Sequence, residues 1–217
     1  TTEIYTLFPT RRSSDLHIGK TFAASARLKL SDEGEILLSG PDIMLGYYKD
    51  PERTAQTVVD GWVHTGDKGR IDDDGFLYIT GRLKEIFKTS SGKYVAPLPI
   101  ESRFSGNALL EQLCLVGRGL PRPILLVVPA PSAADLGRAR MEATLRRQLD
   151  EANEAGEPHE RISHVIVCGG RWTTENGLLT HTLKTLRDEV EARYLPVIRQ
   201  CAQGLHEGAI VWEDDVV

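Results

Sequence analysis

Several polar residues that follow strand-like segments have the types and spacing needed for phosphate and ribose chemistry. Asp67 ends a Thr-Gly-Asp turn, where a carboxylate can accept hydrogen bonds from two neighbouring ribose hydroxyls. Arg82 comes directly after Gly81, and a guanidinium fixed there can fork onto ribose or phosphate oxygens. Lys84 and Lys88 follow in the same basic stretch, within reach of a phosphate.

Two further segments add small residues and a lysine. Gly92 lies in TSSGKYVAP at residues 89–97, where small side chains let a backbone approach a ligand closely, although the spacing is not that of a Walker loop. Lys184 ends the turn-rich segment ENGLLTHTLK, which we expect to deliver it just inside a helix start, where it can stabilise charge on a phosphate. Taken singly, each segment is also typical of an ordinary turn, hairpin tip or surface lysine.

The elements that position these residues fall into two regions. Residues 20–80 predict short strands and turns, including a turn at 65–67 and a hairpin. Residues 82–217 predict a small α+β domain. The expected strands are 35–39, 69–71, 76–80, 112–116, 124–128 and 161–168. The expected helices are 51–59, capped by Asp50, then 97–105, 138–153 with Met141, Leu145 and Leu149 on one face, and 182–194.

Composition narrows the class of protein. The net charge of -5 argues against nucleic acid as a partner, since phosphate binding needs clustered Lys and Arg. No apolar run approaches the roughly 20 residues that span a bilayer. The three cysteines lack metal-ligand spacing and predict reduced thiols in a cytoplasmic protein. The Asp72–Asp74 run lacks the later ligands of a calcium loop, so we predict no metal site in this chain.

The first sixteen residues differ from the rest of the chain. TTEIYTLFPTRRSSDL has no sustained periodicity and resembles a translated sequencing adapter. We therefore expect residues 1–16 to be non-native, and the protein proper to begin in the middle of a domain.

The motifs taken together resemble the adenylate-forming (AMP-binding) enzymes. GWVHTGDKGRIDDDGFLYITGRLKEIFKTSSGKYVAPLPIE is similar to the late core motifs of that superfamily, in order, and ENGLLTHTLK is similar to its C-terminal lysine motif. The resemblance covers about residues 30–195, and the versions SSGKYVAP and NGLLTHTLK are most like those of long-chain fatty-acid–CoA ligases. Residues 117–170 match less clearly, and His181 stands where those relatives usually carry proline, which puts the stiffness of the lysine loop in question.

The resemblance implies a fold, a reaction and roles for the residues. Residues 17–81 would be the β-rich end of a large adenylation domain, and residues 82–217 a small mobile α+β domain that turns about Lys84. A fatty acid and ATP would give acyl-adenylate, and CoA would then displace AMP. Asp67 and Arg82 would hold the ribose, Lys184 would act in adenylation, Lys88 would touch the adenylate, and Gly92 would lie on the hairpin that lines the CoA path.

The resemblance also implies what this chain lacks. The Mg²⁺ ligands, the phosphate loop and the acyl pocket would lie in an N-terminal part, so we expect the 217 residues alone to be inactive. Three alternatives stay open: an aryl- or medium-chain acid CoA ligase, a non-catalytic nucleotide-binding or regulatory module, and a purely structural α+β domain. Acyl chain length, oligomeric state and peripheral contact with the inner face of the membrane are also left open.

Overall fold

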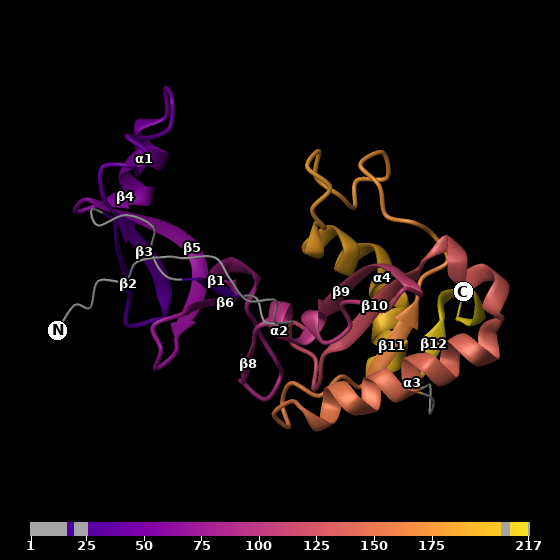
Figure 1. Cartoon of the computed structure of the whole chain (residues 1–217). Helices are drawn as coiled ribbons and strands as arrows, with labels where there is room; N and C mark the ends of the chain where they lie inside the picture. Colours follow the sequence, from indigo (N-terminus) through magenta and orange to yellow (C-terminus); the bar gives the residue numbers. More distant parts are fainter. Residues whose placement is uncertain (1–16, 20–25, 205–208, 217) are drawn as a thin grey trace. The chain divides into compact units, whose positions relative to one another are not determined.

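A computed structural model describes residues 17–19, 26–204 and 209–216 of the chain (Figure 1). The adapter-like segment 1–16 lies outside these residues. The chain forms two compact units, and the boundary between them falls between Lys84 and Glu85.

The first unit is built on an antiparallel sheet. Its strands follow the order β1-β6-β5-β3-β2, and the short β4 pairs with β5. The elements are β1 (His17–Gly19), β2 (Arg27–Leu30), β3 (Glu35–Ser39), α1 (Pro51–Thr57), β4 (Val58–Val59), β5 (Trp62–Ile71), β6 (Leu77–Arg82) and the 3₁₀ turn η1 (Leu83–Glu85). A small core of Leu28, Ile36 and Leu77 lies under the sheet.

Helix α1 starts where the sequence predicts and stops earlier. The Asp50 side chain accepts a hydrogen bond from the Arg53 backbone N–H at 3.0 Å, and proline occupies the first helical turn. The predicted end at residue 59 is wrong by two residues, because Val58 and Val59 leave the helix and pair with Val63 and Trp62.

The predicted turn at residues 65–67 is an irregularity inside one long strand. Between the pairs Glu35–Lys68 and Leu37–His64, β5 carries more residues than β3, so the extra residues bulge out of the ladder. Gly66 has φ +72, a conformation that glycine adopts without a steric penalty. The strand therefore continues through the Thr-Gly-Asp segment, and the separate strand predicted at 69–71 is its last part.

The hairpin predicted after this segment is confirmed. β5 and β6 are antiparallel partners, joined by a turn that Asp72 closes. Its carboxylate accepts hydrogen bonds from the Phe76 and Asp74 backbone N–H groups at 2.8 and 3.1 Å. These bonds, the Phe76 bond first, lower the pKa of Asp72.

The second unit is a four-stranded mixed sheet with helices on both faces. The strand order is β12-β11-β10-β9, with β10, β11 and β12 parallel and β9 antiparallel at one edge. The elements are β7 (Phe87–Lys88), β8 (Tyr94–Val95), α2 (Pro97–Ser102), β9 (Leu110–Val116), β10 (Ile124–Pro129), η2 (Pro131–Leu136), α3 (Arg138–Glu154), β11 (His164–Val167), α4 (Arg187–Ala202), β12 (Ile210–Trp212) and η3 (Glu213–Asp215).

Alternation along β9, β10 and β11 gives the sheet two apolar faces. One face packs on α3 and α2 through Leu115, Leu125 and Val165 among others, and the other packs on α4 through Val116, Leu126 and Ile166 among others (Figure 1). The periodicity of α3 is confirmed, because Met141, Leu145 and Leu149 are all buried. The mixed α/β class predicted from the sequence is therefore confirmed.

The last helix differs from its prediction. The sequence predicts a helix at 182–194, but α4 begins at Arg187 and continues to Ala202, with Pro196 inside it. The preceding residues form a small hairpin instead: Leu179 bridges to Thr185, and Leu183 adopts a left-handed φ of 60. Lys184 therefore lies in a turn ahead of the helix and not inside its start. Strand β12 was not predicted.

All three cysteines are buried in the α4 side of this unit. Cys114, Cys168 and Cys201 are free thiols within the same apolar cluster. Burial raises the pKa of Cys114 and of Cys168 to about 12 and that of Cys201 to about 11. They are therefore packing residues, as the sequence predicts.

Candidate functional site

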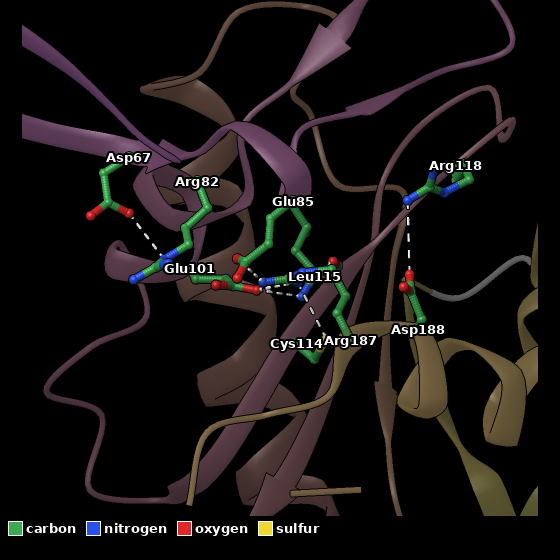
Figure 2. A network of polar contacts seen from close by, with 9 residues as sticks. All are labelled: Asp67, Arg82, Glu85, Glu101, Cys114, Leu115, Arg118, Arg187 and Asp188. Atoms are coloured by element: carbon green, nitrogen blue, oxygen red, sulfur yellow. Dashed lines mark hydrogen bonds and ion pairs between the residues drawn. The ribbon is translucent and has the colours of Figure 1, made fainter. Parts of the chain in front are cut away.

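Asp67 and Arg82 meet at the end of the β5–β6 hairpin. They are register partners across the two strands, and Arg82 Nε lies 3.0 Å from Asp67 Oδ1 (Figure 2). The Arg82 side chain is about half exposed, whereas that of Asp67 is mostly covered. The pair presents a carboxylate and a guanidinium together at this end of the hairpin.

Glu35 holds the segment that carries Asp67. One carboxylate oxygen accepts a hydrogen bond from the Gly66 backbone N–H at 2.9 Å, and the other lies 2.8 Å from His64 Nδ1. Thr65 also donates its hydroxyl to the Ile36 carbonyl on β3. Glu35 was not predicted as a site residue, although its place before the apolar run of β3 fits a residue that faces the neighbouring strand.

A cavity of about 730 Å³ opens beside this pair within the first unit. Arg82, Lys84, His64 and Gly66 reach it from one side, and residues of α1 such as Arg53 line the other. Two of the predicted site residues, Arg82 and Lys84, thus line one cavity that holds both acidic and basic groups.

Lys88 and Gly92 lie on the β7–β8 hairpin of the second unit. Gly92 has φ +82, and a side chain there would lie 3.6 Å from Lys88 Cε. Buried Thr89 ties the tip through hydrogen bonds with Lys93 and Ser91. The Ser90 backbone N–H also donates to the Leu120 carbonyl at 2.9 Å, so the hairpin is anchored to a second loop.

Lys184 lies on the loop that joins β11 to α4. Its backbone N–H donates to Thr180 Oγ1 at 3.0 Å, and its carbonyl accepts from the Thr180 N–H at 2.8 Å. The side chains of His181, Leu183 and Lys184 are exposed. The loop therefore displays the lysine outward on a hydrogen-bonded turn, and the exposed His181 lies on the same turn.

A buried ion pair lies at the start of α4. Arg187 Nη1 lies 2.6 Å from Glu101 Oε1 of α2 and donates to the Leu115 carbonyl of β9 at 2.5 Å, and Nη2 lies 3.4 Å from Glu85 (Figure 2). Burial alone would lower the pKa of Arg187, but Cys114, Glu101 and Glu85 together raise it above its ordinary value. Neither Glu101 nor Arg187 was predicted to have a role, because nothing in the sequence around either residue indicates that its side chain is covered.

The predicted site residues thus fall into three groups. In the first unit Arg82 and Lys84 line one cavity and Asp67 pairs with Arg82 beside it. Lys88 and Gly92 share the hairpin, and Lys184 stands on its own loop. Over residues 17–19, 26–204 and 209–216, no three His, Cys, Asp or Glu side chains are grouped to hold a metal ion. In the same part of the chain, no helix is long and apolar enough to cross a membrane.

Comparisons with known proteins place this geometry in a class. Residues 84–204 match the model of the C-terminal domain of AMP-binding enzymes. The chain is 32% identical over 194 residues to long-chain-fatty-acid–CoA ligase FadD15 of Mycobacterium tuberculosis, and this match covers 82% of this chain and 32% of that protein. It is 34% identical over 197 residues to long-chain-fatty-acid–CoA ligase 5 of Mus musculus, and this match covers 82% of this chain and 29% of that protein.

A solved structure agrees with these relatives. The adenylation domain of a carboxylic acid reductase from Segniliparus rugosus, in complex with AMP and a co-purified carboxylic acid, superposes with a TM-score of 0.67. It is 28% identical, and the match covers 84% of this chain and 32% of that one. The fold is that of the adenylate-forming enzymes, and the chain belongs to the family of AMP-binding enzymes. It spans about a third of the length of the curated relatives it matches.

The buried ion pair generates a stability prediction. Glu101→Ala should lower the free energy of unfolding by about 3 kcal/mol, because it leaves the Arg187 charge buried without its nearest partner. The measurement is urea denaturation of the 217-residue chain, followed by circular dichroism. Asp215→Ala is the matched control, since its pair with Arg138 is about half exposed and should contribute little. Equal losses in the two variants would contradict this assignment.

Proposed function

We propose that this chain is the C-terminal part of an ATP-dependent long-chain fatty acyl-CoA ligase. The observation that carries the proposal is the Asp67–Arg82 pair beside a cavity, in a chain whose named relatives are long-chain-fatty-acid–CoA ligases. AMP bound in the reductase adenylation domain supports nucleotide binding by the same fold. The fatty acid, ATP and CoA are the proposed substrates.

The first half-reaction joins the acid to AMP. The carboxylate attacks the α-phosphorus of ATP, and pyrophosphate leaves. Catalysis of such a step consists mostly of positioning and of neutralising phosphate charge. In this proposal Asp67 and Arg82 hold the ribose hydroxyls, Lys184 neutralises charge at the α-phosphate and the attacking carboxylate, and Lys88 contacts the adenylate.

The second half-reaction transfers the acyl group to CoA. The thiol attacks the acyl carbonyl, and AMP leaves. We propose that the second unit turns about Lys84 between the two steps, a hinge motion that replaces the Lys184 loop with the β7–β8 hairpin. Gly92 at the hairpin tip would then let the CoA thiol pass close to the backbone. The unit boundary and the start of the family match, both next to this lysine, support the hinge.

Lys184→Ala tests the role of the lysine. In the full-length ligase, adenylation should slow by about 10²–10³-fold, the usual scale for one electrostatic contact to a transition state. Thioester formation from preformed acyl-adenylate should stay within about twofold, because the lysine acts in the first step only. Pyrophosphate release and acyl-CoA formation, measured separately, give the two rates.

A matched variant shows whether the loss of any exposed positive charge has the same effect. Arg147→Ala removes an exposed cation from α3 and should change neither rate. A comparable loss in both half-reactions for Lys184→Ala would contradict the assigned role.

The choice of acid tests the substrate class. The full-length ligase should use palmitate with a kcat/KM at least about tenfold above that for benzoate, because its named relatives act on long-chain acids. A coupled assay of AMP formation measures both substrates. A preference for benzoate would favour the aryl-acid alternative.

The chain of 217 residues should not form acyl-CoA by itself. We assign the phosphate loop, the Mg²⁺ ligands and the acyl pocket to a part of the ligase that this chain does not contain. The purified chain, incubated with palmitate, MgATP and CoA, should give no acyl-CoA above a protein-free blank by mass spectrometry. Sustained turnover would show that the chain holds a complete site.

A further inference from the structure

Both ends of the loop that carries Lys184 are tied to edge strand β9. At the first end, the Trp172 backbone N–H donates to Gln112 Oε1 at 2.8 Å, and Gln112 Nε2 donates back to the Trp172 carbonyl at 2.9 Å. At the second end, Arg187 donates to the Leu115 carbonyl. Between these attachments Leu178 is buried in the core on the α4 side and Leu179 packs against it, so the loop is held at both ends and through these two leucines.

The second attachment also completes the edge of the sheet. Among the strands that the structure describes, β9 pairs with β10 alone, so the Leu115 backbone groups on its outer side bond to no strand of this set. Glu101 accepts the Leu115 N–H at 2.7 Å, and Arg187 donates to the carbonyl of the same residue. Because Leu115 is fully buried, water cannot hydrogen-bond its backbone groups. The Glu101–Arg187 pair bonds them in place of a neighbouring strand.

The distance along the chain from this attachment to Lys184 is short. Arg187 follows Lys184 by three residues, which span at most about 10 Å when extended. Within this stretch the Leu186 N–H donates to the Leu178 carbonyl at 2.9 Å, which further restricts the path. Leu183, next to the lysine, holds a left-handed conformation that costs free energy and persists only where its surroundings enforce it.

The guanidinium also contacts Cys114 Sγ at 3.3 Å and the carboxylate of Glu85. Glu85 lies 3.4 Å from Arg187 Nη2 and is 44% exposed, whereas Arg187 and Glu101 are 16% and 13% exposed. Glu85 directly follows Lys84, the proposed hinge residue. The same arginine therefore contacts the residue after the hinge and holds residues 185–187, the stem of the loop that carries Lys184.

We propose that Arg187 is a positioning residue for Lys184: it pins the stem of the lysine loop to β9 and α2 and links that stem to Glu85. Its catalytic consequence rests on the proposed ligase function, whereas its effect on the loop does not. The ion pair with Glu101 sets the position of the stem, and Glu85 is the weaker, more exposed contact.

Hydrogen exchange tests the positional claim on the 217-residue chain. Arg187→Lys keeps the charge but loses the fork that reaches Glu101, Leu115 and Glu85 together. The Lys184 amide, protected by Thr180 Oγ1, should exchange at least about tenfold faster in this variant. The amides of Val165 and Ile166 in the buried sheet report any loss of global stability, and their exchange should accelerate by a smaller factor than that of the Lys184 amide. Arg138→Lys, in an exposed pair on α3, is the matched control and should leave the Lys184 amide unchanged.

Half-reaction rates test the catalytic consequence in the full-length ligase. Arg187→Lys should slow adenylation by about tenfold and thioester formation from preformed acyl-adenylate by less than about twofold. Glu85→Gln should shift the adenylation rate in the same direction by a smaller factor. A merely structural arginine would lower both half-reactions together.

The outcomes separate this inference from the proposed function. Unchanged exchange of the Lys184 amide in Arg187→Lys overturns the positional claim, and so does an equal increase across the sheet amides. A larger acceleration at the Lys184 amide than at the sheet amides supports it, even if Lys184→Ala shows no difference between the half-reactions. An equal effect of Lys184→Ala on both half-reactions would count against the ligase mechanism and not against the attachment of the loop.

Discussion

An edge strand whose outward backbone groups must be satisfied is the constraint on which the second unit depends. Leu115 is buried, yet its N–H and carbonyl face away from β10. A buried unpaired amide or carbonyl is costly, and the unit meets that cost with the Glu101–Arg187 pair. In turn, the backbone of β9 supplies part of the polar surroundings that two buried charges require. Strand, ion pair and the start of α4 therefore stabilise one another.

The two units hold their functional groups by different means. In the first, Asp67 belongs to a strand, and Glu35 on the neighbouring strand fixes the bulge next to it. In the second, Lys184 stands on a hydrogen-bonded turn of a loop whose two ends are tied to β9. In the proposed ligase mechanism, Asp67 binds the ribose throughout and benefits from a rigid sheet, whereas Lys184 acts in one step and needs a support that moves as a body.

Local patterns made part of this structure predictable. The buried face of α3, the Asp50 cap and the β5–β6 hairpin each depend on residues close together in sequence, and the site motifs are contiguous. The contacts that hold those motifs are not local: Glu35 and Gly66 are 31 residues apart, Gln112 and Trp172 are 60 apart, and Glu101 and Arg187 are 86 apart. A single sequence carries no signal for such pairs. The start of α4 was mispredicted for another reason: residues 183–186 bond back to residues 178–180 in a small hairpin instead of extending the helix.

The burial of the thiols has a practical consequence for spectroscopy. Reagents such as maleimides attack thiolates, and each native cysteine is both enclosed in the core and held in its protonated form. A cysteine introduced on the exposed surface would therefore react with a fluorophore or spin label, while the three native cysteines stay in place and unlabelled. The packing of α4 thus leaves the chain suited to distance measurements between its two units without any prior removal of cysteines.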